Sequence, residues 1–242
     1  MPIIKGKTPE GLVAHAQRAL REKWWYVWGT FGNELTEPLL EQKARQYPTY
    51  NGGQNKAIHR AHLGQTVSDC VGLIKGYCMW SDKQDKPVYR ADLDYNTGMM
   101  YNAATVKGGI CTIPDRAGIC VYMQGHVGVY VGDGWVIECA GGRGAVRTPL
   151  SGQGATKWTR WFECPFIDYK TANKPNKPSD SALKIGDRVQ VKEGAGTWRG
   201  GRFAGWVYDD TFVLMELKGE RAVIGRGGRV TGAVNVKNLR RA

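Results

Sequence analysis

Long apolar runs are absent from this 242-residue sequence, and the opening segment Met1-Pro2-Ile3-Ile4-Lys5-Gly6 leads directly into polar residues. A membrane-spanning helix needs about 20 consecutive apolar residues. A secretory signal needs an apolar core of roughly 7–15 residues. The sequence therefore predicts neither membrane insertion nor a signal peptide. We expect a protein that is made in a reducing cytoplasm and at first stays there.

Paired cysteines are missing as well. The six cysteines form no CxxC pair, and the four histidines do not cluster with them at zinc-finger spacing. A disulfide framework is typical of small secreted domains, and structural zinc sites need closely spaced Cys and His ligands. We therefore expect no metal site, and five of the six cysteines, including Cys78, as small buried apolar residues. His15, His59 and His62 are expected at the surface or in packing contacts.

Acidic residues are scarce relative to basic ones: 22 Asp and Glu stand against 34 Lys and Arg, which gives a net charge of +12. Half of this excess lies in residues 183–242, where 12 basic residues face 6 acidic ones. Such a balance favours an anionic partner, for example nucleic acid, an acidic cell-wall polymer or a membrane surface. Charge alone does not choose among these, and a basic surface without a partner remains an alternative.

The first part of the chain predicts a mixed α+β domain over residues 1–168. Thr8 is a suitable N-cap with Pro9 at the first helical position, and apolar residues then recur at helical spacing as far as Trp28. A polar excursion over residues 33–67 contains a second expected helix, and a further inward-facing helix follows Cys70. Strands are expected at residues 119–123, 126–131 and 135–140.

The last part of the chain has a different character. Residues 169–182 (YKTANKPNKPSDSA) lack apolar periodicity and predict a linker. Residues 183–242 contain short alternating runs separated by turn residues, which predict a small all-β barrel. The expected strands include residues 189–191, 206–208, 212–215, 222–224 and 233–236.

Cys70 and His126 carry the clearest chemical signal. Cys70 follows Ser68-Asp69 and precedes the expected helix, and a helix N-terminus favours thiolate over thiol. His126 opens a strand in Gly125-His126-Val127-Gly128-Val129-Tyr130, so that it shares one face with Gly128. We expect the glycine to leave open space for a substrate. A histidine beside a cysteine can serve as general base and then as general acid.

A third group is needed to orient the imidazole, and Glu138 on the next strand is the candidate. A two-residue loop, Asp133-Gly134, would place Val129 opposite Glu138, which would then point away from His126. A three-residue loop that begins at Gly132 would instead place Gly128 opposite Glu138, on the face of His126. The sequence permits either arrangement.

Three segments together resemble the NlpC/P60 family of peptidoglycan peptidases. They are Tyr26-Val27-Trp28-Gly29, then Asp69-Cys70-Val71-Gly72-Leu73, then His126-Val127-Gly128-Val129-Tyr130-Val131-Gly132-Asp133-Gly134. They occur in the family's order, within residues 24–150. Gly186-Asp187-Arg188-Val189 and Trp206-Val207-Tyr208 are similar to the bacterial SH3-like wall-binding repeats of phage endolysins, in an arrangement of the clostridial type.

The resemblance implies a papain-like α+β catalytic domain, in which the cysteine-bearing helix packs on an antiparallel sheet, followed by an SH3-like barrel. It implies Cys70 as nucleophile, His126 as base and Glu138 as the third polar residue. Tyr26 would line the site and Asp69 would contact the peptide stem. In the barrel, Trp198, Trp206 and Tyr208 are the candidates for wall contact. No metal or organic cofactor is required.

Two features depart from the family's pattern. Val71 stands where the family has serine in Asp-Cys-Ser-Gly, and the excursion over residues 33–67 is longer than usual. Both departures leave undetermined which bond of the substrate is cleaved. The expected function is hydrolysis of the D-γ-glutamyl–diamino acid bond of peptidoglycan, by a lysin that stays in the host cytoplasm until lysis and then acts on the wall.

Three alternatives remain. The same machinery fits an N-acetylmuramoyl-L-alanine amidase. A non-catalytic wall-binding or virion protein is the second alternative. The third is a nucleic-acid-binding protein, because bases can stack on aromatic residues such as Trp198, Trp206, Tyr208 and Phe212, which a small barrel also needs as its core. We expect peptidoglycan and anionic wall polymers as partners, without nucleic acid or membrane insertion.

Overall fold

The computed structural model describes residues 3–170 and 183–241, and the chain divides into two compact units, residues 1–175 and 176–242. Most of the predicted linker lies outside the described residues. Tyr169, which the sequence places at the start of that linker, is buried in the core of the first unit, where its hydroxyl donates to the Gly118 carbonyl at 2.7 Å.

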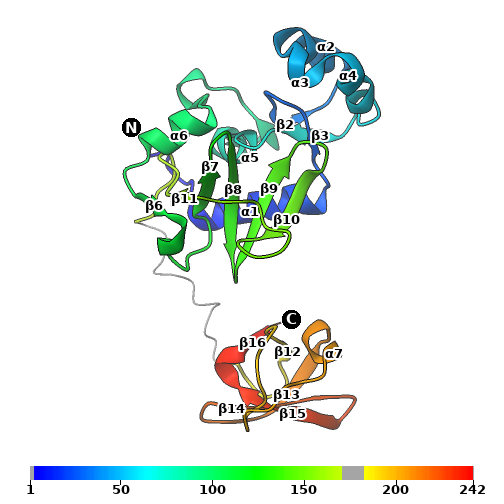
Figure 1. The fold of residues 1–242 in the computed structure, drawn as a ribbon, viewed down its shortest axis with the longest axis vertical. Helices are drawn as coiled ribbons and strands as arrows, with labels where there is room; N and C mark the ends of the chain where they lie inside the picture. The colour runs from blue at the N-terminus through cyan, green and yellow to red at the C-terminus, as the bar shows by residue number, and fades with distance from the viewer. Residues whose placement is uncertain (1–2, 171–182, 242) are drawn as a thin grey trace. The chain divides into compact units, whose positions relative to one another are not determined.

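The first unit is α+β, as its sequence predicts, and its centre is a six-stranded antiparallel sheet (Figure 1). The strand order is β10-β9-β8-β7-β11-β6. The bounds are β6 Lys107–Gly109, β7 Cys120–Met123, β8 His126–Gly132, β9 Trp135–Ala140, β10 Gly144–Pro149 and β11 Arg160–Phe162. The expected strands thus form within one residue of their predicted ends.

Two helices, α1 (Pro9–Arg21) and α5 (Gly72–Met79), pack with this sheet around the main hydrophobic core (Figure 1). Thr8 caps α1 by accepting a hydrogen bond from the Gly11 N–H, as expected. The helix ends at Arg21, however, and not at Trp28. Lys23 adopts φ 54°, which terminates the helix and directs the chain into a strand.

A small second sheet leads the chain to Cys70. Its order is β1 (Trp25–Tyr26), β3 (Thr66–Ser68), β2 (Phe31–Glu34), with β1 parallel to β3. The excursion between β2 and β3 contains the helices α2 (Glu37–Gln46), α3 (Pro48–Asn51) and α4 (Gly53–Arg60). The expected second helix is therefore present, and a separate cluster of buried residues, Val27, Leu35, Leu40 and Val67, packs beneath it.

The remaining elements of the first unit are short. They are β4 (Trp80–Ser81), β5 (Lys86–Pro87), α6 (Thr97–Ala103) and the 3₁₀ helices Ala91–Leu93 and Ile110–Thr112.

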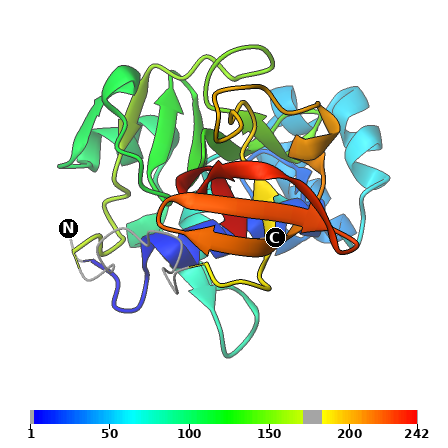
Figure 2. The same cartoon turned by 90° about the horizontal axis from the view of Figure 1, so that it is seen from below.

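The second unit is a five-stranded antiparallel sheet of order β15-β14-β13-β12-β16 with its own hydrophobic core. Figure 2 shows its long strands β13 to β15 in orange and red. The bounds are β12 Arg188–Val191, β13 Phe212–Lys218, β14 Arg221–Arg226, β15 Arg229–Asn235 and β16 Leu239–Arg241, with a 3₁₀ helix at Val236–Asn238. The strand expected at residues 206–208 is wrong, because Trp206–Asp209 forms a helical turn, α7, that buries only Val207.

Two glycines let α5 lie directly against the backbone of β2 and the loop before it. A Cβ added to Gly72 would lie 2.0 Å from the Thr30 carbonyl oxygen, and one added to Gly76 would lie 2.2 Å from that of Phe31. Both contacts are with backbone, which cannot move aside as a side chain can. Gly72 and Gly76 are one helical turn apart and therefore lie on the same side of α5. The close contact of this side with the backbone fixes the position of the helix that follows Cys70.

We expect Gly76→Ala to destabilise the first unit by about 1–3 kcal/mol because of this overlap. Helix propensity alone predicts the opposite sign, a gain of about 1 kcal/mol. Urea unfolding measures the difference. Gly141→Ala is the control, since no atom lies within 4 Å of its added Cβ. A stability of Gly76→Ala at or above that of the wild type would contradict the close packing.

Candidate functional site

The register of β8 and β9 brings His126 and Glu138 together. Val129 pairs with Ile137 and Tyr130 with Val136, so that Gly128 falls opposite Glu138. The loop itself has two residues, Asp133 and Gly134, both with positive φ. A bulge between Tyr130 and Gly132 adds the extra residue that shifts the register. Of the two arrangements that the sequence permits, the structure has the two-residue loop together with the register of the three-residue loop.

Glu138 is fully buried, and its carboxylate accepts three hydrogen bonds. His126 Nε2 lies 2.6 Å from Oε2, and the hydroxyls of Thr148 and Thr156 donate to Oε1 at 2.7 and 2.6 Å. Burial opposes ionisation of Glu138, but the hydrogen bonds from His126 and the two threonines outweigh it. The pKa of Glu138 therefore lies below its ordinary value.

An ionised carboxylate only accepts hydrogen bonds, so a neutral His126 must carry its proton on Nε2. Its Nδ1 lone pair is then available to accept a proton. This is the tautomer that a general base needs. Thr148 on β10 and Thr156 in the following loop were not identified from the sequence, because neither belongs to a motif and both reach Glu138 only through tertiary folding.

Trp158 occupies the space beside His126 that Gly128 was expected to leave open. The indole stacks on the imidazole, with ring centroids 5.4 Å apart and planes inclined by 9°. A Cβ on Gly128 would lie 3.1 Å from the indole and 2.7 Å from Val136. Gly128 therefore makes room for an aromatic side chain and not for a substrate. Trp158 Nε1 is buried without a hydrogen-bond partner among the described residues.

Cys70 lies between β3 and α5, and its sulfur contacts the start of β8. Sγ lies 4.0 Å from the Gly125 carbonyl oxygen and interacts with the Val127 backbone N–H. These two residues flank His126 in sequence. The fold therefore places the Cys70 sulfur against the backbone on both sides of His126, from segments 55 residues apart.

The Cys70 thiol is not ionised at neutral pH, contrary to the expectation from its helix. Burial and the nearby charge of Asp69 raise the pKa of Cys70 to about 12, although backbone N–H groups act in the other direction. Cys70 precedes the helix, and the N–H of Gly72 at the helix start is already capped by Asp69 Oδ1 at 2.6 Å. Desolvation therefore outweighs the helix dipole.

Tyr26 lies beside Cys70 because β1 pairs with β3, with Tyr26 opposite Ser68. Burial raises the pKa of Tyr26, and the proximity of Cys70, to which it is hydrogen bonded, adds to the effect. Its hydroxyl therefore stays protonated at neutral pH beside the sulfur.

Asp69 is buried, and both of its oxygens accept backbone N–H groups. Gly72 donates to Oδ1, and Gly29 donates to Oδ2 at 2.8 Å. Burial raises the pKa of Asp69 despite these bonds. In this structure Asp69 joins the Gly29 loop to the start of α5, and its predicted contact with a peptide stem stays a prediction.

The other expected residues fall as follows. His15, His59 and His62 make packing contacts with tryptophans, and Cys78 is buried. Burial lowers the pKa of His15 to about 3. Cys111 is exposed, which contradicts the expectation that it would be buried.

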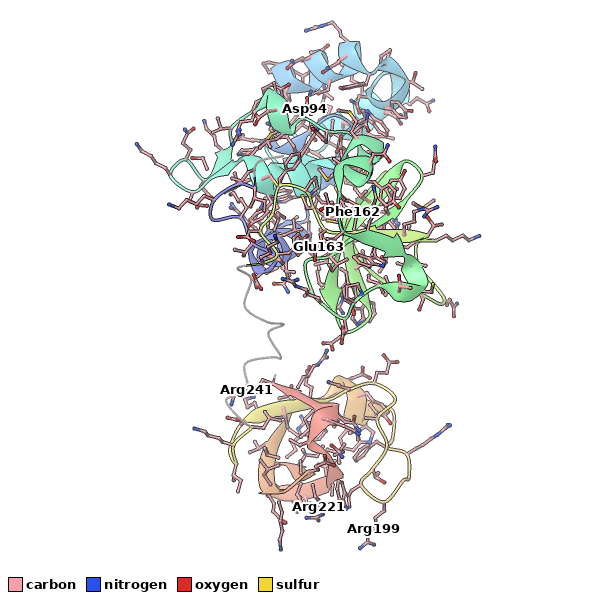
Figure 3. The ribbon with its side chains drawn as sticks, turned by 90° about the vertical axis from the view of Figure 1, so that its left-hand side faces the viewer. Asp94, Phe162, Glu163, Arg199, Arg221 and Arg241 are labelled. Carbon is pink, nitrogen blue, oxygen red and sulfur yellow. The ribbon has the colours of Figure 1, made fainter. Side chains whose placement is uncertain are left out.

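In the second unit, Trp198 and Trp206 are 43% and 54% exposed, whereas Phe212 belongs to the core. Tyr208 is partly buried and donates its hydroxyl to the Ala195 carbonyl at 3.0 Å, so it is less available than the two tryptophans. Arg199, labelled in Figure 3, lies next to Trp198 in sequence and is exposed. Two exposed aromatic residues and a nearby cation therefore face solvent from this unit.

The chain matches no protein family, no curated protein and no solved structure. Over residues 3–170 and 183–241, no group of three or more His, Cys, Asp or Glu side chains could bind a metal ion. Within those same residues, no helix has the length and apolar character needed to cross a membrane.

The raised pKa of Cys70 makes a test of its resting state possible. At pH 7, iodoacetamide should label exposed Cys111 faster than Cys70, and Cys70 labelling should rise steadily as the pH increases above 9, because the pKa of Cys70 is about 12. Peptide mass spectrometry measures both rates. In urea the two rates should converge. Preferential labelling of Cys70 at neutral pH would show instead that the thiolate is the resting form.

Proposed function

We propose that this protein is a peptidoglycan hydrolase that cleaves an amide of the stem peptide by cysteine catalysis. The observation that carries the proposal is that the Cys70 sulfur is hydrogen bonded to Tyr26 and lies against the backbone on both sides of His126, whose ring is paired with Glu138. A buried carboxylate that accepts from an imidazole, beside a thiol, is the arrangement that nucleophilic catalysis requires. Peptidoglycan is proposed as the substrate because the sequence motifs resemble those of the NlpC/P60 family.

The proposal extends to the fold. A helix that follows the cysteine and packs with an antiparallel sheet bearing the histidine is the arrangement of a papain-like domain. The five-stranded second unit is proposed as an SH3-like module that binds the wall. Its basic charge and its exposed Trp198 and Trp206 suit a polymer with anionic groups.

Catalysis begins with a neutral pair. His126 Nδ1 takes the Cys70 proton as Sγ attacks the amide carbonyl carbon, and Glu138 stabilises the imidazolium that forms. The backbone N–H groups of Cys70 and Val71 lie beside the sulfur and stabilise the oxyanion. His126 then protonates the leaving amine. A water molecule, deprotonated by His126, attacks the thioester carbon, the C–S bond breaks, and His126 returns the proton to Cys70 Sγ.

The D-γ-glutamyl–diamino acid bond is the proposed target, and the protein would reach it from the cytoplasm once the membrane is breached. The amidase alternative differs only in the bond cleaved. Mass spectrometry of digested cell walls separates the two: the endopeptidase creates a new N-terminal diamino acid, and the amidase frees an N-terminal L-alanine.

Cys70→Ala should abolish the loss of turbidity of susceptible walls while leaving co-sedimentation with those walls unchanged. His126→Ala should slow hydrolysis by roughly 10²–10⁴-fold, the usual contribution of a general base. Cys111→Ala is the matched control, because that exposed thiol lies outside the site. Retention of full lytic activity by Cys70→Ala would refute the mechanism.

Trp198→Ala and Trp206→Ala should each weaken binding to purified walls by roughly tenfold, because exposed aromatic side chains are frequent energetic anchors. Hydrolysis of small soluble muropeptides should not change. Ile185→Ala is the control, since this side chain is 66% exposed but not aromatic. Binding of the full chain to oligonucleotides but not to walls would favour the nucleic-acid alternative.

A further inference from the structure

A cavity of about 400 Å³ lies beneath the excursion, separate from the Cys70 sulfur. Its walls come from β2, α2, α5 and the segment before α6. The residues that define its chemistry are Phe31, Lys43, Tyr47, Lys75, Tyr89 and Asp94. Figure 3 labels Asp94 beside the helices of the excursion.

Two lysines and one aspartate line the cavity, so its lining carries one excess positive charge. The ammonium of Lys75, a residue only 7% exposed, pairs with Asp94 Oδ1 at 2.5 Å, and the Tyr89 hydroxyl donates to Oδ2 at 3.1 Å. These two charges therefore cancel. Lys43 donates to the neutral Gln46 Oε1 at 3.1 Å, and among the described residues it forms no ion pair.

The surroundings of Lys43 also favour the binding of an anion. Partial burial and the charge of Lys75 lower the pKa of Lys43, although the charges of Asp69 and Asp94 act in the opposite direction, so its ammonium form is destabilised in the absence of a ligand. A bound carboxylate would relieve this cost. Aromatic walls and the amide side chains of Gln42 and Gln46 add the contacts that a peptide needs.

The cavity adjoins the candidate site through Gly29. Gly29 lines the cavity and donates its N–H to Asp69, the neighbour of Cys70. The charges of Lys75 and Lys43 both act on the Asp69 carboxyl. A peptide chain whose amide lies at Cys70 therefore has an anion site close by.

We propose that this cavity binds a free carboxylate of the peptidoglycan stem peptide, with Lys43 as its main electrostatic partner. The identity of the peptide rests on the proposed function. A volume of about 400 Å³ lies in the usual range of small-ligand pockets, and α2 belongs to the excursion that this chain inserts between its motifs.

The test compares two soluble stem peptides, identical except that one has its carboxylates converted to carboxamides. The full-length wild type should bind the carboxylate peptide more tightly, by roughly tenfold in Kd, as measured by calorimetry with the Cys70→Ala background to prevent turnover. Lys43→Gln in that background should remove the preference. Arg45→Gln, an exposed position on the same helix with the same change of charge, should retain it.

The outcomes separate the two proposals. Equal affinities for the two peptides, or a preference that survives Lys43→Gln, would overturn the cavity assignment even if the wild type digests walls. A Lys43-dependent preference in a protein that digests no wall would support the carboxylate site and refute the hydrolase. Circular dichroism confirms that each variant is folded, so that a loss of binding is assigned to the side chain.

Discussion

The first unit depends on stabilising the ionised carboxylate of Glu138 in its interior. A fully buried charge is costly, and here three donors from three segments stabilise it. His126 belongs to β8, Thr148 to β10 and Thr156 to the following loop. The β8–β9 bulge is what places Glu138 on their side of the sheet. Without that single additional residue, the carboxylate would face away from the imidazole.

Local signals predicted much of this fold, and the exceptions have physical causes. The Thr8 cap, the strands at residues 119–140 and the buried face of the helix after Cys70 follow from short-range patterns. The protonated state of the Cys70 thiol does not follow from such patterns, because burial by segments distant in sequence sets its pKa. The filling of the Gly128 space by Trp158 also depends on a loop far along the chain. The end of α1 at Arg21 depends on one left-handed backbone conformation, at Lys23.

The excursion over residues 33–67 is joined to the site by polar contacts and not by apolar packing alone. Asn51 is completely buried, and its amide group bonds the N–H and the carbonyl of Trp28 as well as the Lys43 carbonyl. Asn51 precedes two glycines in the sequence, and no motif marks it for this role. This residue fixes the loop from Tyr26 to Gly29 against the helices of the excursion. A segment that looked peripheral thus helps to shape the surroundings of Cys70.

The protonated state of Cys70 has a consequence for chemical durability. Peroxide converts thiolates to sulfenic acid far faster than thiols, and further oxidation is irreversible. A sulfur whose pKa is about 12 presents almost no thiolate at neutral pH. Oxidation of the Cys70 sulfur is therefore slow in the protein as it stands, whereas the exposed thiol of Cys111 lacks the protection of burial.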